Sequence, residues 1–184
     1  MMYSFRSQKG LTLIESLVAI FIFSLSLASL MVISSRGIQS VAVASQRATA
    51  QFLAQEGIEI VEAIRDDNFL DVNSTSWLEN LDVCTTSTGC FISAVEFTEQ
   101  GNMPLACPSS CPPFTTSQNA AGPEYQYGPG DPTPFVRTIR IEGNNSDEMI
   151  PVYSNVRWSR SGVDYDVEVI KYMTNWFQPT LVTP

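Results

Sequence analysis

The stretch "SQKGLTLIESLVAIFIFSLSL", residues 7–27, decides the fold because it begins a long apolar segment directly after a lysine and a glycine. One carboxylate, Glu15, lies near the start of this otherwise uncharged run. From Ser16 to Ser35 there is no charged residue, and this is about the length that an α-helix needs to cross a bilayer. The sequence therefore predicts a membrane helix that carries a carboxylate near its N-terminal end.

The helical pattern continues beyond the apolar run. The chain has no proline before Pro104, and residues 38–66 are rich in residue types that favour helix. Apolar and small side chains recur at helical spacing along one face: Ala42, Leu53, Gly57, Ile60, Val61 and Ile64. We therefore expect one helix from about Leu11 to about Asp66. Its first half, residues 11–35, is apolar all round, and its second half, residues 36–66, is amphipathic and suited to packing a globular domain.

The N-terminal segment is not typical of an ordinary secretory signal. Such a signal places small residues at a cleavage site after its apolar stretch. Here the small residues of "SLSLAS" lie inside the run, and the helical pattern extends well past it. Cleavage after the apolar run is the alternative interpretation that this pattern disfavours.

The eleven letters "KGLTLIESLVA", residues 9–19, resemble the type III signal of type IV pilins and type II secretion pseudopilins. The resemblance implies that residues 1–10 are a leader, which a membrane prepilin peptidase cuts off after Gly10. Leu11 then becomes the N-methylated N-terminus, although the family most often has Phe there. Thr12 and Glu15 match the family's assembly positions, where the carboxylate neutralises the terminal amine of a neighbouring subunit in the filament core.

The chemistry of Glu15 agrees with this resemblance. A carboxylate inside an apolar membrane helix costs about 2.5 to 3.5 kcal/mol on insertion scales, and such residues are generally paired. No Lys or Arg lies within a helical turn of Glu15 after Gly10, so its partner has to come from elsewhere. A new α-amino group at Leu11 of another subunit would supply it and would set the axial register. The alternative is a carboxylate that merely extends to the membrane interface.

The resemblance also narrows the role of the chain. Val32 stands where major pilins commonly carry a proline, so the chain is more similar to a minor pilin. Its expected partners are other pilin subunits through the N-terminal helix, the prepilin peptidase and, before assembly, the inner membrane. The expected location is the cytoplasmic membrane with the head outside, and then an extracellular or periplasmic filament. The alternatives are a minor pseudopilin of a type II secretion system and a membrane-tethered extracytoplasmic binding module that never polymerises.

The C-terminal region, residues 135–184, predicts an antiparallel sheet. Apolar and polar residues alternate in three segments, and Ser161-Gly162 predicts a tight hairpin between the last two. The segments are "FVRTIRIEG" at 135–143, "MIPVYSNVRWS" at 149–159 and "VDYDVEVIKYM" at 163–173. The expected fold class is α+β: a long N-terminal spine helix packed against a C-terminal antiparallel β-sheet, which is also the pilin-like fold.

Residues 67–134 contain most of the glycine and proline and predict a loop-rich part of the head. We expect one short strand there, "FISAVEF" at residues 91–97. The segments "PLACPSSCPPF" and "GPEYQYGPGDPTPF" are turn-rich, and we expect no regular elements in them.

All four cysteines, Cys84, Cys90, Cys107 and Cys111, lie in this loop-rich region. An even number in a chain destined for export favours two disulfides. Of the three connectivities that four cysteines allow, we prefer Cys84 to Cys90 and Cys107 to Cys111 because short loops close most easily. A zinc site is the alternative, but five residues separate the first pair, which does not fit the usual ligand spacing.

Composition excludes several functions. The chain has no histidine, which removes Ser-His-Asp and Cys-His hydrolases, and we expect no enzymatic activity and no cofactor. Its net charge of −9 argues against nucleic acid as a partner. The acidic residues of the head lack the spacing of a calcium loop and are interpreted as solvated surface charge.

Overall fold

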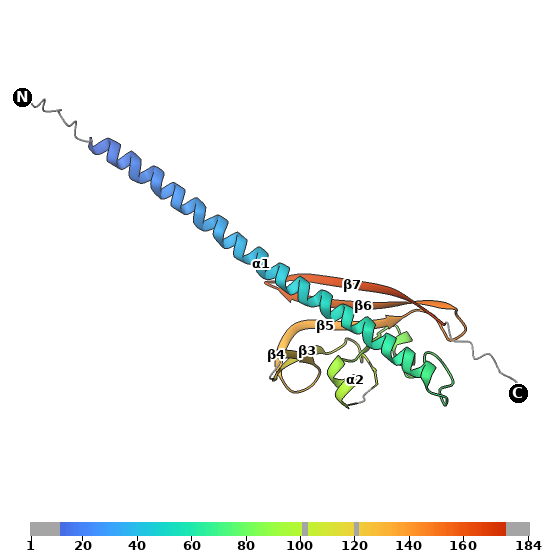
Figure 1. Cartoon of the computed structure of the whole chain (residues 1–184). Coiled ribbons are helices and arrows are strands. Elements are labelled where there is room, and N and C mark those ends of the chain that lie inside the picture. Colours follow the sequence, from blue (N-terminus) through green and yellow to red (C-terminus); the bar gives the residue numbers. More distant parts are fainter. Residues whose placement is uncertain (1–11, 101–102, 120–121, 176–184) are drawn as a thin grey trace, which may run out of the picture. The chain divides into compact units, whose positions relative to one another are not determined.

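The computed structural model describes residues 12–100, 103–119 and 122–175. The predicted cut between Gly10 and Leu11 lies outside these residues. The chain divides into two compact units between Ser45 and Gln46. The elements are α1 (Leu13–Leu70), η1 (Asp82–Thr85), β1 (Cys90–Phe91), α2 (Ala94–Gln100), β2 (Leu105–Ala106), β3 (Pro113–Asn119), β4 (Gly122–Gln126), β5 (Asp131–Ile141), β6 (Met149–Arg160) and β7 (Val163–Thr174) (Figure 1).

Helix α1 confirms the predicted long helix and ends at Leu70, four residues beyond the expected Asp66. Thr12 caps its first turn, where the Glu15 N–H donates to the Thr12 carbonyl over 3.1 Å and lies 3.4 Å from Thr12 Oγ1. This is the Thr-x-x-Glu arrangement typical of a capping box. Further along, the Ser24 and Ser26 hydroxyls donate to carbonyls four residues earlier, over 2.8 and 2.9 Å. These two hydroxyls of the apolar half are thus satisfied within the helix.

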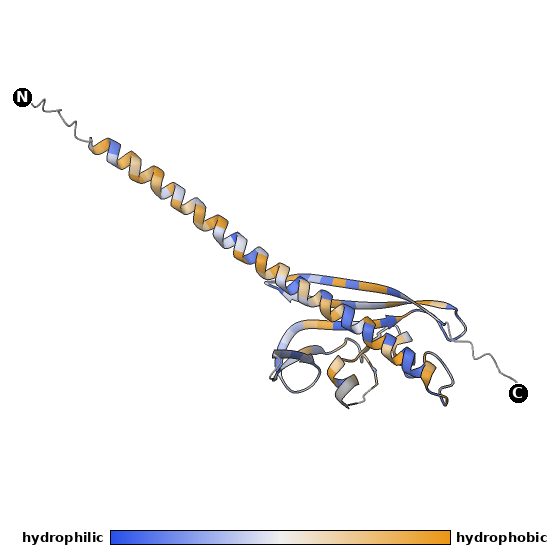
Figure 2. Ribbon diagram, viewed as in Figure 1, coloured by the Kyte–Doolittle hydropathy of each residue, from blue (hydrophilic) through white to orange (hydrophobic). Residues whose placement is uncertain are grey.

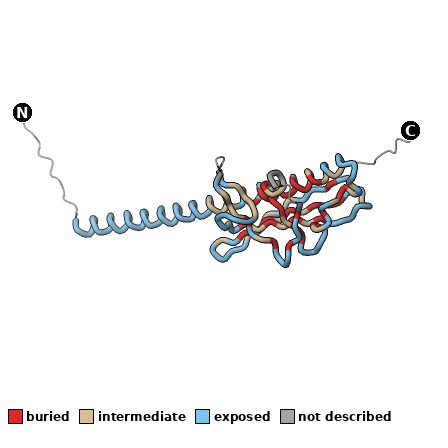
Figure 3. The backbone as a smooth tube through the Cα atoms, turned by 90° about the horizontal axis from the view of Figure 1, so that it is seen from below, coloured by how far each residue is buried: buried red, intermediate tan, exposed pale blue. Residues whose placement is uncertain are grey.

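The first unit holds the apolar half of α1. Nearly all of its described residues are exposed, and most of them are apolar (Figures 2 and 3). By length and composition this helix is sufficient to cross a membrane, and none of its most apolar window is buried. A segment of this kind requires an apolar environment or apolar partners.

The second unit contains a seven-stranded sheet in which the long strands are β5, β6 and β7. One edge of β5 pairs with β6, and the other edge pairs with β3 and β1, so that Val136 lies between Pro113 and Arg157. Every pairing is antiparallel. Strands β6 and β7 form the predicted hairpin, in which Ser161 and Gly162 both have positive φ, 51° and 78°. Two such residues in succession are typical of a type I′ turn.

The core of the head forms where α1 packs on one face of this sheet. The amphipathic stripe predicted from the sequence is buried from Leu53 to Ile64. The alternation predicted for β5 and β6 also holds, because all of its expected core residues are buried: Ile139, Ile141, Ile150, Val152, Val156 and Trp158. In β7 the alternation is correct, but Val163, expected to face the core, is 52% exposed. It is the first residue of a strand at the edge of the sheet.

The predicted strand at residues 91–97 is wrong. Strand β1 ends at Phe91, and α2 occupies the rest of the segment. The reason is a reciprocal capping box in which the Ser93 N–H donates to Glu96 Oε2 over 3.1 Å and the Glu96 N–H lies 3.5 Å from Ser93 Oγ. This local Ser-x-x-Glu signal outweighs the β-propensity of the flanking apolar residues.

The expectation of no regular elements between residues 104 and 135 is also wrong. The turn-rich segments contain β2, β3 and β4, and β5 begins at Asp131. Prolines are tolerated where a strand starts or lies at a sheet edge, because no ladder hydrogen bond is lost there. Pro113 is the first residue of β3, and Pro123 lies in β4, which pairs with β3 alone.

Candidate functional site

Thr12 and Glu15 occupy the first turn of α1, which is the described part of the predicted assembly site. Glu15 is exposed and is the one charged residue between Thr12 and Ser35. A carboxylate in the first turn is favoured by the partial positive charge of the helix N-terminus. Within the described ranges no Lys or Arg forms an ion pair with Glu15. Its negative charge is therefore free to meet a cation from outside.

The surface that follows Glu15 is made of large apolar side chains. Leu13, Phe21 and Ile33 are each more than 60% exposed, and their apolar neighbours along the helix are similar. Soluble proteins rarely expose contiguous apolar patches of more than a few hundred Å² unless these contact a membrane or a partner. The site thus consists of a carboxylate and the apolar helix that follows it. Within the described part of the first unit, no other element packs on this helix.

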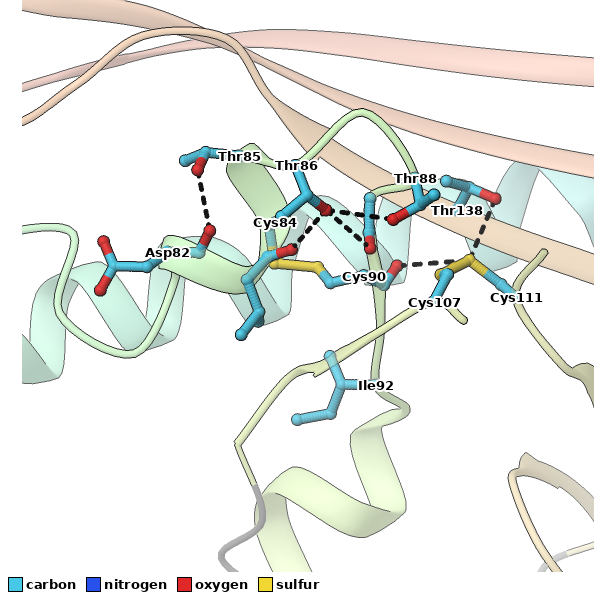
Figure 4. Close-up of a disulfide and its surroundings, with 12 residues drawn as sticks. Asp82, Cys84, Thr85, Thr86, Thr88, Cys90, Ile92, Cys107, Cys111 and Thr138 are labelled. Atoms are coloured by element: carbon cyan, nitrogen blue, oxygen red, sulfur yellow. Dashed lines mark hydrogen bonds between the residues drawn. A yellow bond between two sulfur atoms is a disulfide. The ribbon is translucent and has the colours of Figure 1, made fainter. Parts of the chain in front are cut away.

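In the head, the structure joins Cys84 to Cys90 and Cys107 to Cys111, the pairing preferred from the sequence (Figure 4). All four cysteines are buried. Because their sulfurs are bonded to one another, none is a thiolate that could bind zinc. The Cys107 N–H donates to Gly89 O over 3.0 Å, and the Cys111 sulfur lies 3.2 Å from Thr138 Oγ1. The first disulfide thus joins η1 to β1, and the second closes the connection between β2 and β3.

A buried arginine, which the sequence analysis missed, joins the helix to the sheet. Arg137 on β5 is fully buried, and its Nη1 donates to Leu53 O over 2.7 Å and to Glu56 Oε1 over 3.3 Å. Its Nη2 donates to the Ile92 carbonyl, and its guanidinium carbon lies 4.9 Å from the centre of the Phe114 ring. In the alternating segment "FVRTIRIEG", Arg137 occupies a position that faces the core. A charged residue at such a position is the signal that could have identified it as a buried arginine.

Two glutamates extend this network to α2 and to the residue that follows β4. Glu56 Oε1 also accepts the Ala94 N–H over 3.1 Å, and Glu96 Oε1 accepts the Tyr127 N–H over 2.8 Å. Burial raises the pKa of the Tyr127 hydroxyl to about 12; the Arg137 guanidinium opposes this rise, and Glu56 and Glu96 add to it. The network is structural, since it connects the second half of α1 to three other parts of the head.

Gly57 explains how closely the helix approaches this network. A Cβ atom at this position would lie 2.6 Å from Ser154 Oγ and 3.0 Å from Arg137 Cδ. Neither distance is compatible with normal van der Waals contact, so the absence of a side chain allows α1 to lie against β5 and β6.

The described residues contain no group of three or more His, Cys, Asp or Glu side chains arranged to hold a metal ion. The acidic residues named in the sequence analysis as surface charge lie mainly at exposed positions.

Comparison with known families supports the N-terminal assignment. Residues 5–31 match the family model of the prokaryotic N-terminal methylation motif. The match includes the predicted leader end at Gly10, the residues Leu11, Thr12 and Glu15, and the start of the exposed apolar helix. Neither the search of curated proteins nor the search of solved structures finds a match. Residues 5–31 thus carry the N-terminal methylation motif that is the prepilin signal of type IV pilins and pseudopilins.

Proposed function

We propose that the chain is a minor pilin subunit of a type IV pilus-like filament and has no enzymatic activity. The observation that carries this proposal is the apolar half of α1, an exposed helix that begins inside the methylation motif and whose single carboxylate, Glu15, forms no ion pair with any described residue. Val32, where major pilins commonly have proline, supports a minor role. The head, stabilised by two disulfides, suits an oxidising compartment outside the cytoplasm.

The proposed mechanism has two steps, processing and assembly. Prepilin peptidase cuts the bond between Gly10 and Leu11 and methylates the new amine, while the apolar helix holds the subunit in the cytoplasmic membrane. The helix then leaves the bilayer and packs against the helices of other subunits. There Glu15 meets the N-terminal ammonium of a neighbour, and the desolvation cost of each charge is offset only when the two are in register.

A minor pseudopilin of a type II secretion system is the second candidate, because the methylation motif at residues 5–31 belongs equally to that group. The two candidates share processing and assembly and differ in the filament that they enter. Loss of surface pili without loss of protein secretion in a strain that lacks the chain supports the pilin; loss of secretion with normal pili supports the pseudopilin.

Intact-mass spectrometry of the membrane-extracted protein tests the processing step. We expect the chain to start at Leu11 with one added methyl group, and a Gly10→Val variant to retain its leader because the bulky side chain blocks cleavage. An unprocessed wild-type chain, or one that begins after residue 30, would contradict membership in a pilus-like filament. The unprocessed chain would favour the membrane-tethered binding module.

A further inference from the structure

Strand β7 forms an unusually long open edge of the sheet. Its twelve residues pair with β6 through an unbroken register, from Met149 opposite Thr174 to Arg160 opposite Val163. Among the strands that the structure describes, it pairs with no other, and the segment contains no proline. The other edges are short: β4 has five residues and includes Pro123, and β2 has two. Natural proteins usually shorten, kink or cover an edge, because an open strand pairs readily with another chain.

The outer side of β7 leaves backbone groups unused. In an antiparallel pair, alternate residues direct their N–H and C=O groups away from the partner strand. In the part of the chain that the structure describes, no backbone hydrogen bond outside the β6 ladder involves residues 163–174. These donors and acceptors are available to an added strand.

The core-facing row of β7 is incompletely covered. Tyr165, Val167 and Val169 are only partly buried, although they face α1 and the core. On the neighbouring strand, the residues opposite them in register, Trp158, Val156 and Ser154, are buried. The difference arises because no described strand lies beyond β7, so a strand added there would bring apolar side chains to this row and complete its burial.

The opposite face of β7 carries a row of acidic side chains. Asp164, Asp166 and Glu168 occupy successive outward positions and are exposed. Asp166 lies opposite Arg157 in register, yet no ion pair forms between them, and the structure gives none of the three carboxylates a cationic partner within its described ranges. Cross-strand pairs of opposite charge stabilise a sheet and like pairs destabilise it. An added strand therefore needs basic residues at these positions.

This charge pattern identifies the type of partner. The chain as a whole has a net charge of −9, so a second copy would approach the acidic row with net repulsion. We propose that the edge of β7 binds an extended, basic segment of a different protein by strand addition. In that segment Lys or Arg alternates with apolar residues, so that the basic side chains face the carboxylates and the apolar ones cover Tyr165, Val167 and Val169. This proposal concerns the head and does not depend on the proposed filament function.

The test uses the full chain in a nonionic detergent and a fluorescent peptide of about ten residues that alternates Lys and Val, a length suited to strand addition. Fluorescence anisotropy measures binding, and hydrogen exchange with mass spectrometry locates it. We expect saturable binding, new protection of residues 163–174, and at least ~tenfold weaker binding to a block peptide with the same lysines and valines in separate halves. Equal binding of both peptides, or protection elsewhere, would overturn the proposal.

Charge reversal distinguishes strand addition from general attraction to an acidic protein. The variant D164K/D166K/E168K should bind the Lys-Val peptide at least ~tenfold more weakly and should gain affinity for a peptide that alternates Glu and Val. The control D67K/D82K/D131K changes the same number of exposed carboxylates on elements that do not pair with β7 and should bind as the wild type does. If the two variants behave alike, the proposal is wrong.

A second measurement on the wild-type protein covers the case in which charge reversal disturbs folding. A Lys-Val peptide N-methylated at alternate residues on the edge that faces β7 cannot donate to the strand but keeps its charge. We expect it not to bind. Binding as strong as that of the unmethylated peptide would show that no backbone ladder forms and would also overturn the proposal.

Discussion

Replacing Arg137 by methionine should destabilise the head strongly. Methionine keeps much of the volume of the aliphatic stem but removes the donors to Leu53 O, Glu56 Oε1 and the Ile92 carbonyl. Breaking a buried charged pair costs about 3 to 5 kcal/mol. The Glu56 side chain is 29% exposed and can be rehydrated, so we expect the lower end of this range, about 3 kcal/mol. That is a large part of the roughly 5 to 15 kcal/mol by which a domain is stable.

Urea unfolding of the full chain in detergent, followed by tryptophan fluorescence, measures this loss, because Trp77 and Trp158 are buried in the head. The matched control is Arg157→Met on the exposed face of β6, where the arginine has no ion pair with any described residue. The control should lose less than about 0.5 kcal/mol. If Arg137→Met unfolds at the same urea concentration as Arg157→Met, the buried network does not hold α1 to the sheet.

Two further predictions concern the head. The unfolded chain ionises Tyr127 from about pH 10, whereas the folded chain keeps it neutral until about pH 12. Stability should therefore fall as the pH rises through this window, by up to about 3 kcal/mol, and urea midpoints should show a smaller fall for Tyr127→Phe. Each disulfide closes a short loop worth about 2 kcal/mol, so Cys84→Ala/Cys90→Ala and Cys107→Ala/Cys111→Ala should each lower stability by that amount. Unreduced wild-type protein should be about four mass units lighter than reduced protein; four free thiols would refute both bridges.

Elements with strong local signals could be predicted from the sequence. Helix α1 combines a cap, an apolar run and an amphipathic stripe, and the β6–β7 hairpin combines strict alternation with a Ser-Gly turn. The disulfide pairing followed from loop length. The assembly role of Thr12 and Glu15 follows from the resemblance to the prepilin signal and stays a prediction.

Elements that depend on competition or on distant contacts could not be predicted in the same way. Ala94, Val95 and Phe97 have apolar side chains suited to a strand, but the capping hydrogen bonds between Ser93 and Glu96 stabilise a helix instead. Strand β3 is stabilised by pairing with β4 and β5. The many prolines in and around these strands predict turns, so the strands could not be recognised from the sequence. Arg137 became recognisable as buried only when Leu53, Glu56 and Ile92, far apart in the sequence, were seen around it.

The most direct test of the central claim, that the chain is a filament subunit assembled through its N-terminal carboxylate, is fractionation of cells into sheared filaments and membranes. The comparison uses wild type, Glu15→Leu and the control Glu59→Leu, which removes an exposed carboxylate from the head half of α1. Glu15→Leu should insert and be cleaved normally, because losing the charge lowers the cost of insertion by about 2.5 to 3.5 kcal/mol. The account predicts that Glu15→Leu stays in the membrane fraction while wild type and Glu59→Leu enter filaments. Equal incorporation of Glu15→Leu and wild type would contradict it.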